Sequence, residues 1–329
     1  MSKPLFLRTL PALAAAAVLA GCSLIPSYER PAAPVASQWP DAKTVVATTT
    51  SVADLDWQDF IGDTNLREVI RLALANNRDL RLAVLNIEQT RAQYQIRRAD
   101  QLPTVSAAIS GSRQSSSEID KSITSSYTAG LSIPASAAWE LDFFGRLGSL
   151  KEAALAQYLA TEEARKATQI SLIASVASTW LSLQANTELL DLAQRTLATR
   201  EDSLRLSRLR FDNGATSSLD LWQAESLAAA ARATAVQQQR LRAQDINALT
   251  LLLGQTVPEP LLRAANTTQP TALFKDLPVG LPSEVLTRRP DIRQAEQQLI
   301  AANANIGAAR AAFFPRITLT AFAGSASSN

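Results

Sequence analysis

Residues 149–213 read SLKEAALAQYLATEEARKATQISLIASVASTWLSLQANTELLDLAQRTLATREDSLRLSRLRFDN, a run of 65 residues without glycine or proline. The run is rich in Ala, Leu, Glu, Gln, Arg and Lys, which favour helices. A single helix of this length would extend roughly 100 Å, at about 1.5 Å per residue. Because helices of globular proteins average about 11–12 residues, the stretch predicts a rod of the coiled-coil kind.

A heptad repeat within this run predicts a partner helix. An apolar residue recurs every seven positions, at Val176, Leu183, Leu190, Leu197, Leu204 and Phe211. Such a repeat forms a coiled-coil seam, which is buried only when a second helix packs against it.

The partner is expected directly after a turn at 213–214, because residues 218–253 also lack glycine and proline. The expected caps are Ser217 or Ser218 with Asp220 at its start, and Gly254 at its end. The sequence therefore predicts a long antiparallel helix pair over 149–253, with its tip at 211–220.

Upstream, the apolar period changes from 3.6 to 2. Residues 62–103 have a helical pattern with a break at 76–77 and a stop at Pro103. Alternating segments at 104–112 and 127–134 then predict one β-hairpin over 104–134. The alternation predicts membrane-strand positions at Val105, Ile109, Tyr127, Leu131 and Ile133.

The predicted strands suit a tilted membrane strand, which needs about 9–11 residues. A soluble hairpin packed on helices would show the same alternation, so the pattern alone leaves both open. The outer-membrane address described below favours the membrane strand.

A shift of 212 positions reveals an internal repeat. The identical pairs include Leu74 with Leu286, Asp79 with Asp291, Arg81 with Arg293, Ala83 with Ala295, Ala92 with Ala304, Arg98 with Arg310 and Pro103 with Pro315. A period-two run then starts at Ile317, as one does after Pro103. Helix, proline and strand therefore occur twice, and Asp79 and Asp291 are expected to be helix-start acids.

The first residues predict a secretion signal with a lipid attachment site. Lys3 and Arg8 precede a short apolar run, which ends in LAGC at 19–22. This ending resembles the bacterial lipobox, so Cys22 is expected to carry a diacylglycerol and become the new N-terminus. Ser23 stands where inner-membrane retention uses Asp, which points to the outer membrane.

Composition excludes several classes of function. The chain has no histidine and only one cysteine, which rules out His/Cys metal sites, Ser-His-Asp triads and disulfides. Removal of the signal leaves 30 basic and 30 acidic residues, because two of the 32 Lys and Arg lie within it. Nucleic-acid binding is therefore not expected, nor is any cofactor besides the lipid on Cys22.

Several motifs carry a family resemblance across nearly the whole chain. They are LAGC (19–22), WELDFFGR (139–146), QYLATE (157–162), AQDINAL (243–249), LPSEVLTRRPDI (281–292) and AANANIGAARAAFFP (301–315). With these motifs the chain resembles the outer-membrane factor (TolC-like) family, and most closely its lipidated OprM branch of RND multidrug efflux outer-membrane proteins.

The resemblance implies a mainly α protomer with membrane β-strands, which assembles as a homotrimer around a barrel and a periplasmic helical tunnel. It also implies an inner-membrane RND transporter and a periplasmic adaptor that grips the hairpin tip. The tip maps onto Arg210, Asn213, Gly214, Ala215, Thr216 and Ser217, with Asn213 where the family pattern has valine. Trimerisation also has a physical basis: four strands per chain cannot close a barrel, and an open edge is not tolerated in lipid.

These observations divide the chain into four parts: a signal peptide (1–21), a proline-rich lipid-anchored tether (22–63), a first repeat (64–278) and a partial second repeat (279–329). Family members continue well beyond a first strand of the second repeat, so the sequence is expected to be a fragment or an interrupted reading frame. Aperture residues would lie in the part that is missing.

The expected function is a passive outer-membrane exit duct for drugs and other small toxic compounds. The alternatives are a coiled-coil envelope lipoprotein without a pore and a type I secretion duct. A third alternative, an enzyme with paired carboxylates, lacks any suitable spacing, so no catalytic residue is expected.

Overall fold

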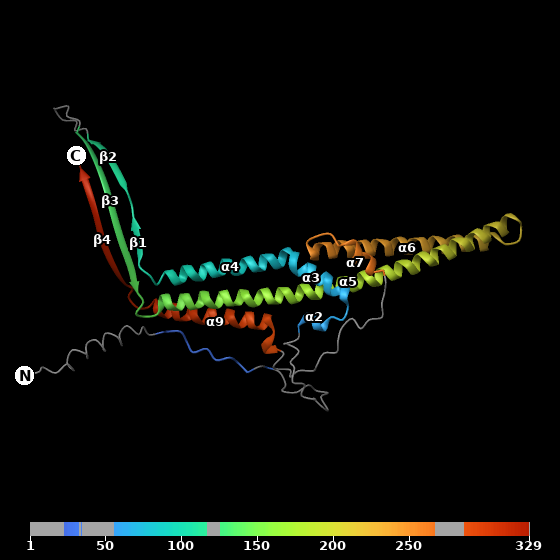
Figure 1. Ribbon diagram of the computed structural model, residues 1–329, viewed down its shortest axis with the longest axis horizontal. Helices are drawn as coiled ribbons and strands as arrows, with labels where there is room; N and C mark the ends of the chain where they lie inside the picture. The colour runs from blue at the N-terminus through green and yellow to red at the C-terminus, as the bar shows by residue number, and fades with distance from the viewer. Residues whose placement is uncertain (1–22, 33, 35–55, 117–125, 267–285, 329) are drawn as a thin grey trace, which may run out of the picture. The chain divides into compact units, whose positions relative to one another are not determined.

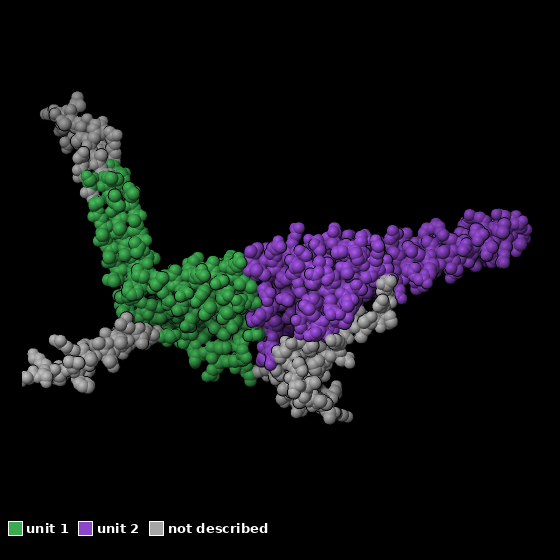
Figure 2. All heavy atoms as spheres, viewed as in Figure 1, with its two compact units in different colours: residues 1–32, 86–162, 293–329 green, residues 33–85, 163–292 purple. Residues whose placement is uncertain are grey.

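The computed structural model describes residues 23–32, 34, 56–116, 126–266 and 286–328 (Figure 1). The chain divides into two compact units (Figure 2). The strand unit comprises residues 1–32, 86–162 and 293–329, and the helical unit comprises residues 33–85 and 163–292.

The helical unit contains the predicted long hairpin and four shorter helical segments. Its elements are α2 (Trp57–Phe60), α3 (Thr64–Asn76), the start of α4 (Arg78–Ala99), the larger part of α5 (Arg146–Asp212), α6 (Ser218–Leu253) and α7 (Glu259–Ala264). The single turn α2 was not predicted, because the stretch before residue 63 shows no apolar period.

The structure confirms both long helices. The second matches its predicted bounds of 218–253, whereas α5 begins three residues before the predicted start at Ser149. Gly148 is accommodated because it lies in the first turn of α5, where its N–H donates to Asp142 Oδ2 at 2.7 Å. The carboxylate thereby bonds one of the N–H groups that every helix start leaves free.

Side chains join α5 to α6 along the hairpin. The cross-helix bonds are Arg208–Glu225 at 2.6 Å, Arg232–Glu201 at 2.6 Å, and Asn186 Nδ2 to Asp245 Oδ2 at 2.6 Å. The predicted seam is fully buried at Val176 and Leu183, half-buried at Leu190, Leu197 and Leu204, and 39% exposed at Phe211. The seam therefore opens toward the tip.

The predicted break at 76–77 is present between α3 and α4. Asn77 is 6% exposed and has an extended backbone, with φ −60° and ψ 132°. Its Oδ1 accepts from the Leu80 N–H, and its Nδ2 donates to the Leu252 carbonyl, both at 2.8 Å. The asparagine thus starts α4 and ties the break to the end of α6.

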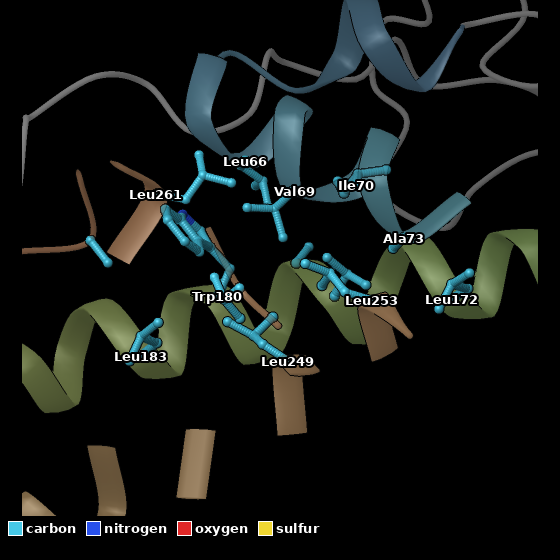
Figure 3. Packing of buried hydrophobic residues seen from close by; sticks show 14 of the residues in the cluster. Leu66, Val69, Ile70, Ala73, Leu172, Trp180, Leu183, Leu249, Leu253 and Leu261 are labelled. Atoms are coloured by element: carbon cyan, nitrogen blue, oxygen red, sulfur yellow. The ribbon is translucent and has the colours of Figure 1, made fainter. Parts of the chain in front are cut away.

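The core of the helical unit lies where α3, α5, α6 and α7 meet, and Leu80 of α4 belongs to the same cluster (Figure 3). Its fully buried side chains include Leu66, Val69 and Ile70 from α3, Trp180 and Leu183 from α5, and Leu249 and Leu253 from α6. Leu261 of α7 contributes at 8% exposure. Each large side chain buried here contributes about 1.5–3 kcal/mol relative to an exposed position.

The strand unit contains an antiparallel sheet whose central strand is β3. Its strands are β1 (Thr104–Ala107), β2 (Ser110–Ser116), β3 (Ser126–Leu141) and β4 (Ile317–Ser328). Along one side of β3 lie β1 and β2 in a single register, from Thr104↔Ala138 to Ser116↔Ser126. The other side pairs with β4, from Gly130↔Ser328 to Leu141↔Ile317.

The predicted hairpin is confirmed, with two differences in its strands. The first strand is interrupted at Ala108–Ile109 opposite Pro134, which has no N–H to complete the ladder. The Ala108 N–H still donates to the Pro134 carbonyl at 3.0 Å, so the register does not slip. Proline does not end the second strand as predicted, since β3 runs on to Leu141.

The internal repeat is confirmed in the helices. The helix α9 (Pro290–Ala311) has 22 residues, as α4 has, and each of its ends lies 212 positions after that of α4. Both predicted helix-start acids, Asp79 and Asp291, lie in first turns. The predicted second period-two run forms β4, which pairs with the strand from the first repeat.

In the described part of the tether, residues 23–32 form neither helix nor strand, in keeping with its prolines. They nevertheless contact α9, which the sequence did not predict. Among the described residues, no helix combines the length and the hydropathy needed to cross a bilayer.

Candidate functional site

The turn that joins α5 to α6 is closed by two backbone hydrogen bonds. The Gly214 N–H donates to the Phe211 carbonyl at 2.9 Å, and the Ala215 N–H donates to the Arg210 carbonyl at 2.8 Å. Together they form a Schellman motif, which requires a left-handed residue, and Gly214 has φ +69°. A Cβ at Gly214 would meet no heavy atom within 4 Å, so conformation rather than space calls for glycine here.

A capping box starts α6 on the other side of the turn. The Asp220 N–H donates to Ser217 Oγ at 3.1 Å, and the Ser217 N–H donates to Asp220 Oδ2 at 3.3 Å. The Thr216 hydroxyl donates to the same carboxylate at 2.8 Å. Hydrogen bonds from the Ser217 and Thr216 hydroxyls lower the pKa of Asp220. Ser217 is therefore the cap, and Ser218 is the first helical residue.

The tip presents polar and apolar groups on one turn of chain. Among the predicted tip residues, Arg210, Asn213, Gly214, Ala215 and Ser217 are exposed, and Thr216 is half-buried. Leu219 and Trp222 were not among the predicted contact residues, yet each is 64% exposed in the first turns of α6. Two large apolar side chains left exposed beside a rigid turn are suited to contact another protein.

The sheet in the strand unit has one apolar and one polar face. Because side chains alternate along a strand, residues of one parity share a face. The odd-numbered face carries Val105, Ala107, Ile109, Leu131, Ile133, Ala135, Ala137, Trp139, Ile317, Leu319, Ala321 and Ala323. Val105 and Ile109 are 76% and 77% exposed, and Leu131 and Ile133 are 52% and 46% exposed.

The opposite face is lined with hydroxyls. Ser106 Oγ lies 2.8 Å from Ser136 Oγ, and Ser110 Oγ lies 2.6 Å from Ser132 Oγ. This face also carries apolar residues, among them Ala138 and Phe322, and Phe322 is 80% exposed. A sheet of this kind separates an apolar environment from an aqueous one.

Both edges of the sheet lack a partner within the described residues, since β1 with β2 pairs only β3 and β4 pairs only β3. Free N–H and C=O groups along such edges pair readily with another strand.

The motif at 139–146 builds the junction between β3 and α5. Arg146 donates through Nε and Nη2 to the two carboxylate oxygens of Glu140, at 2.8 and 2.7 Å. Phe144 stacks on Phe314, with ring centroids 4.5 Å apart. The ring contact joins two of the motifs quoted above, one from each repeat.

A family model described as outer membrane efflux protein matches residues 69–255 and 281–329, which include the helix hairpin, all four strands of the sheet and α9. The chain belongs to the outer membrane efflux protein family.

Relatives within this family are close in sequence. The probable efflux pump outer membrane protein TtgC of Pseudomonas putida is 48% identical over 322 residues. That alignment covers 94% of this chain and 65% of TtgC. Outer membrane protein OprJ of Pseudomonas aeruginosa is 44% identical over 332 residues, covering 99% of this chain and 68% of OprJ.

Solved structures of the family share the fold. The MtrE outer membrane channel of Neisseria gonorrhoeae, in its open state, superimposes with a TM-score of 0.73 at 36% identity. The match covers 93% of this chain and 72% of that one. A membrane protein from Pseudomonas aeruginosa gives a TM-score of 0.75 at 39% identity, over 94% of this chain and 73% of that one. The predicted TolC-like fold class and family are thus confirmed.

Cys22 lies outside the described residues. Tyr127 is described only through its backbone, which pairs with Ser115 in the sheet. The remaining predicted strand residues lie on the apolar face, and the six predicted tip residues lie together in the α5–α6 turn.

The junction residues were not predicted to be functional, although the family motif that contains them was recognised. The sequence did contain a sign of this junction. It has three charged residues close together at the end of the alternating apolar run, Glu140, Asp142 and Arg146, and charges placed where a strand ends need partners. In the described part of the chain, no group of three or more His, Cys, Asp or Glu side chains is placed to hold a metal ion.

Proposed function

We propose that this protein is the outer-membrane channel component of a tripartite RND-type efflux pump. It would act as a passive exit duct for drugs, solvents and other small toxic compounds, without catalysis. Its membership of the outer membrane efflux protein family supports this proposal, as do relatives named as efflux pump outer membrane proteins.

The observation that carries the proposal is the two-faced sheet with two unpaired edges. An apolar face suits lipid, and a hydroxyl-lined face suits a water-filled lumen. Both edges need further strands in a membrane, where an unpaired backbone group costs several kcal/mol. Three copies of the chain around a common axis supply such strands, so the proposed assembly is a homotrimer.

Exposed apolar residues on the helices support the same assembly. Leu82 and Ile96 of α4 are 62% and 61% exposed, and Leu299 of α9 is 51% exposed. Several large apolar residues left in solvent on one chain indicate contacts with neighbouring helices. In the proposed trimer the helices of neighbouring copies cover them and form a periplasmic tunnel.

Anchoring in the outer membrane is proposed to use both the lipid on Cys22 and the strands. The expected effect of Cys22→Ser is weaker membrane attachment with the fold retained, because the strands still insert. Membrane fractionation and size-exclusion chromatography measure both properties. A variant that is fully soluble and monomeric contradicts the proposal.

The hairpin tip is the proposed contact for a periplasmic adaptor, which in turn links the duct to an inner-membrane RND transporter. A cysteine at exposed Ala215 is expected to crosslink to the adaptor in cells, whereas a cysteine at exposed Ala230, on α6 outside the tip, is not. Equal crosslinking at the two positions contradicts this assignment.

The conduit itself is tested by single-channel recording of the purified protein in a planar bilayer. Stable conductance steps from folded trimers are expected. Ser132→Arg, on the polar face, should change ion selectivity, whereas the conservative Ser132→Thr should not. Folded trimers that give no current argue against a duct and favour a coiled-coil lipoprotein without a pore.

A further inference from the structure

The segment directly after the lipidation motif lies along α9 in an extended form (Figure 1). Two backbone carbonyls of this segment accept from side chains of α9. Asn303 Nδ2 donates to the Pro26 carbonyl at 2.7 Å, and Arg310 Nη1 donates to the Leu24 carbonyl at 3.4 Å. Both contacts hold the backbone of the segment, not its side chains.

A two-bond ion pair holds the far end of the segment. Arg30 Nε and Nη2 each lie 2.5 Å from one carboxylate oxygen of Glu296. The Tyr28 hydroxyl donates to the same carboxylate at 3.3 Å. The Glu296 side chain is only 17% exposed as a result, and the Arg30 hydrogen bonds lower its pKa.

The spacing of these contacts shows that the segment is stretched along the helix. From Glu296 to Arg310 there are 14 helical residues, which rise about 21 Å. From Arg30 to Leu24 there are six residues, which span at most about 20–22 Å. The two lengths are similar, and the order of the contacts, from Arg30 at Glu296 to Leu24 at Arg310, makes the segment antiparallel to α9.

A glycine on α9 makes room for the segment. A Cβ on Gly307 would lie 2.5 Å from Ile25 Cγ1, 3.0 Å from Ile25 Cα and 2.8 Å from Ser149 Oγ. Gly307 is helical and costs stability there relative to alanine. The absence of a side chain is therefore explained by the close approach of both Ile25 and Ser149.

We propose that α9 carries a docking groove for residues Leu24–Arg30, and that this groove sets the position of the lipid-bearing cysteine. Leu24 docks beside Arg310, in the last turn of α9 and shortly before β4 begins. Cys22 is two residues away, within about 7 Å of chain. Docking of Leu24 thus limits how far the attachment point can lie from the end of α9. One part of this proposal rests on the proposed function, namely that Cys22 carries a lipid.

Thiol labelling of the full chain tests the groove without relying on the lipid. In a Cys22→Ser background the chain has no other cysteine. A single cysteine is placed at half-buried Ile25 or, as a matched position, at exposed Ser27. The cysteine at 25 is expected to label about tenfold more slowly, which corresponds to about 1.4 kcal/mol of docking free energy.

Two substitutions on α9 should remove that protection. Gly307→Leu fills the space of Ile25, and Glu296→Gln weakens the ion pair without changing size. Each should bring the labelling rate at 25 close to the rate at 27. Glu68→Gln is the control, because Glu68 also bonds an arginine through both oxygens, but that arginine is Arg71 of the same helix, α3, and not a residue of the segment. Circular dichroism verifies that each variant keeps its helices.

Equal labelling at 25 and 27 without any substitution on α9 would overturn the proposal. Protection that survives both Gly307→Leu and Glu296→Gln in folded protein would overturn it as well. Neither result bears on channel conductance, so failure of the groove and failure of the proposed duct are distinguishable.

Discussion

Two glycines with the same backbone conformation should respond differently to the same substitution. Gly214 at the hairpin tip has φ +69°, and Gly254 at the end of α6 has φ +68°. Alanine in this left-handed region costs roughly 1–2 kcal/mol through its own backbone strain. This conformational cost is common to Gly214→Ala and Gly254→Ala.

Their surroundings differ. A Cβ at Gly214 meets nothing within 4 Å, whereas a Cβ at Gly254 lies 2.5 Å from the Asn76 carbonyl oxygen and 3.2 Å from its carbonyl carbon. Backbone atoms cannot swing away as a flexible side chain can. Overpacking of this kind costs about 1–3 kcal/mol. The expected loss is therefore about 1–2 kcal/mol for Gly214→Ala and about 2–5 kcal/mol for Gly254→Ala.

Urea unfolding of the detergent-solubilised protein, followed by far-ultraviolet circular dichroism, measures both losses from the midpoints. Asparagine at the same positions separates the two causes, because it tolerates the left-handed region but still carries a Cβ. Gly214→Asn should leave the free energy of unfolding nearly unchanged, whereas Gly254→Asn should still lose most of the free energy that the clash with the Asn76 carbonyl costs. The reasoning is refuted if Gly254→Ala and Gly214→Ala destabilise equally, within about 0.5 kcal/mol.

Three further outcomes are expected. Because the folded-state pKa of Asp220 is lowered, its cap stabilises α6 above the ordinary carboxyl pKa and is lost as pH falls through the folded value. The protection of the tip amides against hydrogen exchange, taken relative to the intrinsic exchange rate at each pH, should therefore fall on acidification in the native chain, and Asp220→Asn should flatten that dependence. A double-mutant cycle of Phe144→Ala and Phe314→Ala should give a coupling of about 0.5–1.5 kcal/mol, and additive losses would contradict the stack. Leu131→Arg on the apolar face should cost up to about 2–4 kcal/mol in folding into lipid vesicles. Ser132→Arg on the polar face should cost clearly less free energy. A larger loss for Ser132→Arg than for Leu131→Arg would mean that the face with Ser132, and not the face with Leu131, contacts lipid.

Local pattern was enough to predict most elements and their ends. The helix from 218 to 253 begins at its capping serine and ends at its left-handed glycine, because both signals act within a few residues. The 212-residue offset placed α9, and the alternation of apolar residues placed one face of the strands. In each case the deciding interaction is local, or is repeated along the chain with a fixed period.

Partners distant in sequence were decided only by the tertiary structure. Alternation shows which face of β4 is apolar, but it does not show that β4 lies beside β3 rather than beside β1. Pro134 was read as the end of a strand, yet pairing with β4 on the other side carries β3 past it to Leu141.

The same limit applies to Gly254 and to the docked segment. A glycine in sequence reveals the conformation it allows, but not the Asn76 carbonyl packed against it. Nor does a proline-rich stretch reveal that Arg30 meets Glu296, 266 residues later. Periodicity records only whether a side chain faces solvent or protein. The identity of the packed partner depends on shape and charge complementarity between surfaces, which exist only after the chain has folded.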